Sequence, residues 1–163
     1  LRQSQKPDGS FKYSIQQDRS TYALTAAAIS SFMLLGRYAT RDQDEDKTRI
    51  EDGIRFLKQS VHDVLVRPEW PFYGHFYAAW AAWQYDGDDP ADEGASRGRI
   101  APDSRRFFGP WHALVFRALL DQQRVEGSWH DESERFGFPP ELPTSFAALT
   151  LAIPDESLPI FQR

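Results

Sequence analysis

Residues 121–131 read DQQRVEGSWHD, and residues 1–14, LRQSQKPDGSFKYS, contain a second version of the same pattern. Each version has a glutamine, then a glycine four residues later, then an aromatic residue two further on: Gln5, Gly9 and Phe11, and Gln123, Gly127 and Trp129. Glycine adopts turn conformations that other residues resist. A glutamine side chain can bond the free backbone groups at helix ends. We therefore expect each copy to be a structural clasp that joins two helices, with the aromatic ring folded over the joint.

The segments around these copies alternate between two kinds of predicted helix. Residues 21–36, 75–85 and 138–153 are rich in small and apolar residues on nearly every side, which is typical of buried, inner helices. Residues 48–65 and 108–123 are amphipathic, which is typical of outer helices. The apolar stripe of the first amphipathic segment consists of Ile50, Ile54, Leu57 and Val61. In the second, Trp111, Leu114, Ala118 and Gln122 are expected to line one side, with Val115 and Leu119 beside them.

The joints between these helices are also predicted from the sequence. Ser20 is expected to cap the first inner helix, which ends at Gly36. The charged run at residues 41–47 and the Gly/Pro/Asp-rich stretch at 87–104 are expected to be loops. No segment alternates with a period of two, so no strand is predicted. The pattern predicts an all-α repeat of helical hairpins, with residues 1–163 in a single domain.

Composition excludes several classes of site. The chain has 163 residues, 14% of them aromatic, and a net charge of −5, with no basic run interleaved with aromatic residues, so nucleic acid is not an expected partner. No apolar run is long enough for a transmembrane helix. Cysteine is absent, which excludes disulfides, thiolate metal sites and cysteine nucleophiles but leaves the compartment unknown. The histidines, His62, His75, His112 and His130, form no metal-binding motif, and neither a metal nor a cofactor is predicted.

The clasp spacing resembles the QW repeat of the prenyltransferase/squalene-hopene-cyclase superfamily. The likeness extends to GIRFLKQ at 53–59, FYGHFYAAWAAWQ at 72–84 and PTSFAALTLAIPDESLPIFQR at 143–163. It implies an α/α toroid, in which inner helices surround a central cavity and outer helices wrap around them. A complete barrel needs more hairpins than this chain holds, so the resemblance implies a partial toroid, the C-terminal part of a longer protein. Its open side would be covered by the remaining half or by self-association.

The resemblance also directs attention to two sets of residues. Cyclases of the hopene type protonate a polyprene from an Asp-rich motif, for which Asp42, Asp44 and Asp46 are weak candidates in a charged, solvated run. The zinc site of protein prenyltransferases needs a cysteine that this chain lacks. The ligand-binding candidates are aromatic or lie beside aromatic residues: Tyr73, His75, Phe76, Tyr77, Trp80 and Trp83. Aromatic residues at helical spacing are more often core than ligand site, and the clasp aromatics are expected to be structural.

Two hypotheses for function remain. One is a non-catalytic repeat domain that binds a polyprenyl, triterpenoid or other apolar ligand in a central cavity. The other is a terpene cyclase, an isomerase of the mutase kind, whose catalytic acid lies outside this segment. Because a fold hosts many functions, the sequence leaves open whether the protein is an enzyme.

Overall fold

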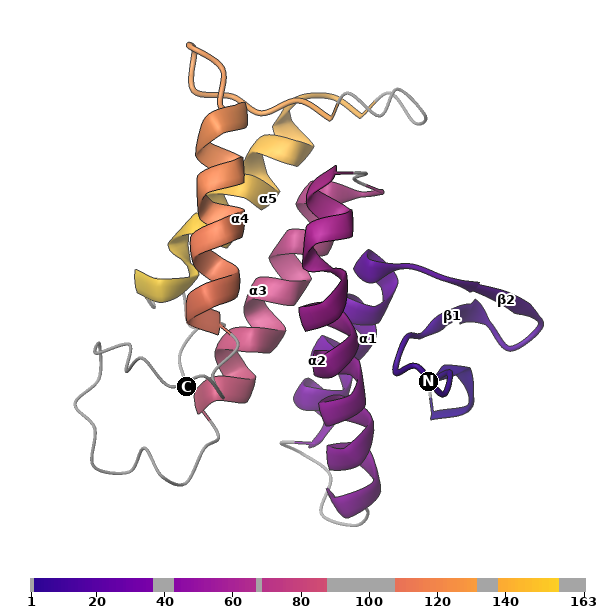
Figure 1. Cartoon of the computed structure of the whole chain (residues 1–163). Coiled ribbons are helices and arrows are strands. Elements are labelled where there is room, and N and C mark those ends of the chain that lie inside the picture. Colours follow the sequence, from indigo (N-terminus) through magenta and orange to yellow (C-terminus); the bar gives the residue numbers. More distant parts are fainter. Residues whose placement is uncertain (1, 37–42, 67–68, 88–107, 132–137, 156–163) are drawn as a thin grey trace.

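The structure, a computed structural model, describes residues 2–36, 43–66, 69–87, 108–131 and 138–155. Within these residues the chain is mainly helical, as predicted, with a small sheet near the N-terminus (Figure 1). The elements in chain order are η1 (Arg2–Ser4), β1 (Lys12–Ser14), β2 (Gln17–Ser20), α1 (Tyr22–Gly36), α2 (Gln43–Val66), α3 (Pro71–Gly87), α4 (Phe108–Gln122), α5 (Glu141–Ala152) and η3 (Ile153–Asp155).

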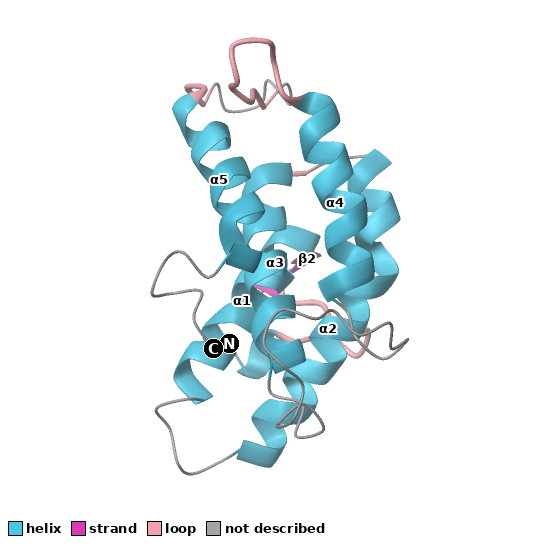
Figure 2. Cartoon of the chain, turned by 90° about the vertical axis from the view of Figure 1, so that its left-hand side faces the viewer, coloured by secondary structure: helices cyan, strands magenta, loops and turns pink. Residues whose placement is uncertain are grey.

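Helix α3 lies at the centre of the arrangement. It makes its main contacts with α1 on one side and α5 on the other, while α2 packs on α1 and α4 packs on α3 (Figures 1 and 2). Small residues allow these close approaches: Ala78, Ala79, Ala81 and Ala82 of α3 are completely buried. A Cβ added to Gly74 would lie 3.1 Å from the Cβ of Ala23, so the backbones of α1 and α3 nearly touch there. The inner helices are therefore held together by alanine and glycine surfaces rather than by large side chains alone.

Helix α2 packs through the predicted apolar stripe. Ile54, Leu57 and Val61 are buried, and Ile50 is partly buried against the core. Gly53 lets the helix lie directly on α1, because a Cβ there would be only 2.6 Å from Cδ1 of Ile29.

The predicted loop at residues 41–47 is wrong from residue 43 onward, because α2 already begins at Gln43. Acidic residues are favourable in the first turns of a helix, and Glu45 pairs with Arg49 one turn later at 2.6 Å. Charge density alone therefore did not distinguish a helix start from a loop. Residues 41 and 42, and residues 88–104 of the second predicted loop, lie outside the described residues.

The small sheet was not predicted. β1 and β2 form an antiparallel pair in which Lys12 lies opposite Ser20 and Ser14 opposite Gln17. The strands have three and four residues, mostly polar and at least partly exposed, so they carry no alternation of apolar and polar residues that would reveal them. An ion pair between Arg19 and Glu69 connects β2 to the segment that leads into α3.

Two further local predictions are corrected. Thr21 rather than Ser20 caps α1, since its Oγ1 accepts a hydrogen bond from the backbone N–H of Leu24 at 3.1 Å. In α4 the buried stripe is Trp111, Val115 and Leu119, four residues apart, while Leu114 is 40% exposed. The helix is rotated so that Val115 and Leu119, which were predicted to flank the stripe, form it together with Trp111.

Candidate functional site

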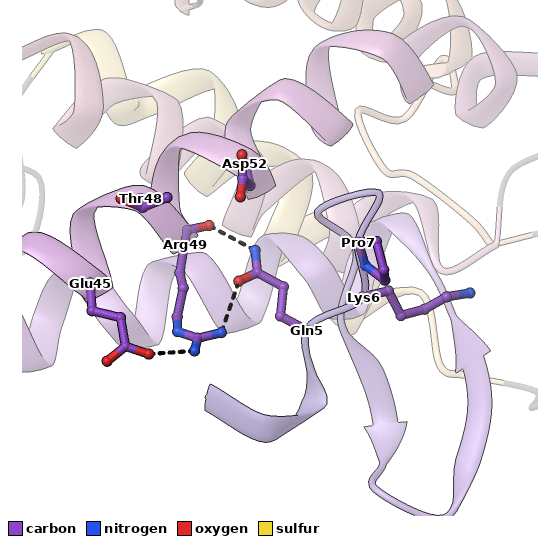
Figure 3. Close-up of a pocket in the computed structure, with 7 residues that line it drawn as sticks. All are labelled: Gln5, Lys6, Pro7, Glu45, Thr48, Arg49 and Asp52. Carbon is purple, nitrogen blue, oxygen red and sulfur yellow. Dashed lines mark hydrogen bonds and ion pairs between the residues drawn. The ribbon is translucent and has the colours of Figure 1, made fainter.

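The first clasp ties the N-terminal segment to α1 and to α2, and Figure 3 shows its bonds to α2. Gln5 Nε2 donates to the carbonyl of Gly9 at 3.2 Å and to the carbonyl of Arg49 on α2 at 2.8 Å. Gly9 has a φ of +89°, a conformation that favours glycine, and its N–H donates to the carbonyl of Lys6 at 2.9 Å. The backbone N–H of Phe11 donates to Oγ1 of Thr25 on α1 at 3.0 Å.

The second clasp repeats these bonds almost one for one. Gln123 Nε2 donates to the carbonyl of Gly127 at 3.0 Å, and Gly127 has a φ of +88°. The backbone N–H of Trp129 donates to Oγ1 of Thr144 on α5 at 3.0 Å, as that of Phe11 does to Thr25. Trp129 is buried and its Nε1 donates to the carbonyl of Leu119 on α4 at 2.7 Å. Each clasp thus fixes the start of an inner helix through a threonine.

The six ligand-binding candidates divide into two groups by the residues that they contact. Tyr73, Phe76 and Tyr77 are half-buried and gather with Phe146 of α5. The Phe146 ring centroid lies 5.5 Å from that of Phe76 and 5.8 Å from that of Tyr73, and Tyr73 and Tyr77 are 4.7 Å apart. These distances suit attractive aromatic pairs, so the two helices share one aromatic face.

An apolar pocket opens at the end of this face, where α3 and α5 begin. It has a volume of about 130 Å³ and is lined by Trp70, Phe72, Tyr73, Asp131, Phe138, Leu142, Pro143 and Phe146. Of these, Tyr73 alone belongs to the residues expected to bind a ligand. The sequence contained one usable signal for the rest, the aromatic Phe146 within a small-apolar helix that must pack on its neighbour. Trp70 and Phe138 line the pocket from loops. The spacing of residues in the sequence does not predict the conformation of these loops.

The pocket contains a backbone conformation that costs energy. Trp70 has a φ of 58°, the left-handed region that residues other than glycine seldom occupy. Its ring packs on that of Phe138, with centroids 5.5 Å apart. Such a conformation costs on the order of 1–3 kcal/mol and is concentrated at functional positions. Burial, with a smaller contribution from Tyr77, raises the pKa of Tyr73 above its ordinary value.

The other three candidates lie away from the pocket. His75 is buried beside the rings of Tyr22 and Trp111, and its Nδ1 has no hydrogen-bond partner among the described residues. Burial lowers the pKa of His75 to about 4, so the imidazole is neutral at neutral pH. The Trp83 ring packs against Phe108 of α4 at 4.9 Å, and Trp80 is 7% exposed. These positions are those of core residues.

Among the acid candidates, Asp46 has a described side chain, and it does not lie in an apolar site. Asp42 lies outside the described residues, and Asp44 is within α2 in a part whose side chain is not described. Asp46 accepts two hydrogen bonds from the Arg2 guanidinium, both at 2.9 Å, at the protein surface. Asp46 therefore lies in a surface ion pair, and not in the apolar surroundings that keep a catalytic acid protonated. Within the described ranges, no cluster of three or more histidine or acidic side chains could hold a metal ion.

A second hollow, of about 470 Å³, lies at the first clasp, and most of the residues that line it are polar. Its lining is Gln5, Lys6, Pro7, Glu45, Thr48, Arg49 and Asp52, shown in Figure 3. The Arg49 guanidinium already bonds the carbonyl of Arg2 and the carboxylate of Glu45. The Gln5 side chain donates to the Arg49 carbonyl of α2. Gln5 and Arg49, which border this hollow, therefore hold the clasp to α2.

No family model, no curated protein and no solved structure matches this chain. Among the described residues, none of the helices has the length and apolar character needed to cross a membrane.

Proposed function

We propose that this chain is a helical-repeat binding domain whose aromatic pocket between α3 and α5 takes the end of an apolar, isoprenoid-like chain. The observation that carries the proposal is the pocket itself, with its aromatic lining and the left-handed Trp70 at its edge. Ligand sites are typically concave and apolar, with few polar groups, and Asp131 is the one charged residue in this lining.

The size of the pocket limits what it can hold. An apolar cavity of about 150 Å³ in another protein binds one benzene molecule. A pocket of about 130 Å³ therefore accommodates a group about the size of one isoprene unit, and not a whole triterpene. The remainder of a longer chain would lie along the half-buried face of Tyr73, Phe76 and Tyr77.

The same proposal assigns the chain to an α/α toroid of the prenyltransferase/squalene-cyclase type. It is supported by the series α1, α3, α5 with α2 and α4 packed outside it, and by two clasps with matching bonds. In such an architecture the aromatic face of α3 and α5 would border the central cavity. Catalysis is not part of the proposal, because Asp46, the acid candidate with a described side chain, is paired with Arg2 at the surface.

The experiment is native mass spectrometry of the chain incubated with farnesol, and with dodecanol as a saturated alcohol of similar length. Burying one isoprene unit contributes about 4 kcal/mol. Leu142→Trp, which fills the pocket from its 40% exposed rim position, should therefore weaken farnesol binding by about 100-fold or more. The matched control is Leu120→Trp on α4, where the leucine is 44% exposed and is not part of the pocket lining.

The outcomes are distinct. Farnesol retained by the wild type and by Leu120→Trp, but lost in Leu142→Trp, supports the proposal. Equal retention of farnesol and dodecanol would mean that the site selects apolar chains in general, which would remove the isoprenoid class. Equal binding by the two leucine variants would place the ligand elsewhere, and no retention by a folded wild type would overturn the proposal.

A further inference from the structure

The two clasps make the same internal bonds but differ in what lies over them. At the first clasp, a Cβ added to Gly9 would lie 2.2 Å from the backbone oxygen of Asp52, so α2 rests directly on the glycine. At the second, a Cβ added to Gly127 would meet one atom, Nε2 of Gln123, at 3.9 Å. Gly9 is buried and Gly127 is exposed. The first clasp is covered by a helix, and the second is open at the equivalent place.

The inner helices show the same difference. Thr25 of α1 and Thr144 of α5 bond the two clasps in the same way. When the two helices are aligned on these threonines, Ala148 of α5 is the counterpart of Ile29 of α1. Ile29 is fully buried, with Gly53 of α2 packed on it. Ala148 is exposed. The surface of α1 that α2 covers therefore has an uncovered counterpart on α5.

The glutamines of the two clasps differ in the same way. Gln5 donates to the carbonyl of Arg49 on α2 in addition to its own glycine carbonyl. Gln123 makes the equivalent internal bond and is exposed. Val125, which corresponds to Pro7 at the edge of α2, is a fully exposed apolar side chain. In Figure 1 this clasp forms the orange loop beyond the end of α4.

We infer that the open surface formed by Gln123, Val125, Gly127 and Ala148 is a docking site for an amphipathic helix of the α2 type, supplied by a partner polypeptide. The structure contains its own template for this complex, since α2 occupies the equivalent surface of the first clasp. The partner helix places a backbone carbonyl over Gln123 and its backbone against Gly127. Because Ala148 replaces Ile29, the partner has a larger side chain where α2 has Gly53.

The probes are synthetic peptides of residues 43–66, one with the natural sequence and one with Gly53→Ile, which restores the volume lost at Ala148. The chain contains no cysteine, so a single Val125→Cys allows one environment-sensitive fluorophore to report on the docking site. The control label is at Ile15→Cys, an exposed apolar position at the turn between β1 and β2. Binding should change the signal of the label at 125 and leave that at 15 unchanged, with tighter binding by the Gly53→Ile peptide.

The blocking variant is Ala148→Arg, and its matched control is Ala113→Arg, an exposed alanine of α4. A buried, unpaired guanidinium costs enough to weaken binding by about tenfold or more in the first variant. The control should bind as the wild type does. Both alanines are exposed, so neither substitution disturbs the folded chain.

Four results would overturn the inference. Two of these are no response of the label at 125 to either peptide, and an equal response of that label in Ala148→Arg and Ala113→Arg. Shielding of that label from iodide in the monomeric chain without peptide would mean that the same chain covers the surface. Shielding that grows with protein concentration, and is lost in Ala148→Arg, would identify a second copy as the occupant in place of a partner helix.

Discussion

Replacing each clasp glycine by alanine separates the strain of the turn from the packing of α2. Gly9 and Gly127 have nearly the same φ, 89° and 88°, so the alanine introduces similar backbone strain in both. The surroundings differ, because the new Cβ would lie 2.2 Å from the Asp52 carbonyl oxygen in the first clasp, but at an ordinary contact distance of 3.9 Å from Nε2 of Gln123 in the second. Gly127→Ala is therefore the control for the strain of the turn in Gly9→Ala.

The magnitudes follow from this geometry. A left-handed alanine costs about 1–2 kcal/mol, which is the whole expected effect of Gly127→Ala. In Gly9→Ala, α2 must also move by more than an ångström, which adds about 1–3 kcal/mol of packing strain. The same movement weakens the bond from Gln5 to the Arg49 carbonyl, worth about 0.5–1.5 kcal/mol. We expect Gly9→Ala to lose about 3–6 kcal/mol in total.

The assay is urea unfolding followed by circular dichroism, with the free energy of unfolding compared between the two variants and the wild type. A gap of about 2 kcal/mol or more between the variants supports the packing of α2 on the first clasp. Equal losses would refute the reasoning, since they would mean that the turn conformation alone sets the cost. A larger loss in Gly127→Ala would show that the second clasp is already covered in the folded chain.

Two further predictions concern the buried polar groups between α1, α3 and α4. Burial lowers the pKa of His75 from 6.5 to about 4, so between these pH values the unfolded chain binds a proton that the folded chain does not. Stability should therefore fall by about 3 kcal/mol as the pH drops from 6.5 to 4, and urea unfolding of His75→Phe should lose this dependence; an unchanged slope would contradict it. The bond from Trp111 Nε1 to the Tyr22 hydroxyl, at 2.8 Å, should give a coupling of about 1 kcal/mol in a double-mutant cycle of Tyr22→Phe and Trp111→Phe. A coupling near zero would show that the bond does not stabilise the fold.

Helical periodicity predicted much of the fold because helix faces are local features of sequence. Ile54, Leu57 and Val61 repeat at helical spacing, and all three are buried on α2. Periodicity did not give the rotation of α4, since Leu114 and Val115 are adjacent and apolar, and contact with the inner layer decides which is covered. Periodicity also did not predict the short polar strands, because their pairing depends on backbone hydrogen bonds and not on side-chain type.

The candidate site was predictable only in part, for a related reason. Tyr73, Phe76 and Tyr77 were identified from their own helix, and the spacing of α3 fixes which of its residues share a face. Their partner Phe146 is about seventy residues away in sequence, and one helix does not specify which neighbour packs on it. Trp70 depends on a left-handed turn at a residue type that seldom adopts one.

The central position of α3 has a consequence for how the molecule loses its structure. Domains made of repeated units can unfold one unit at a time when each unit touches only its neighbours. Here α3 contacts α1, α4 and α5, and the completely buried alanines on it leave little space between these neighbours. Removing either α1 and α2 or α4 and α5 would expose part of α3. The stability of each pair of helices is therefore tied to that of the other pair. We therefore expect the helices on both sides of α3 to unfold together.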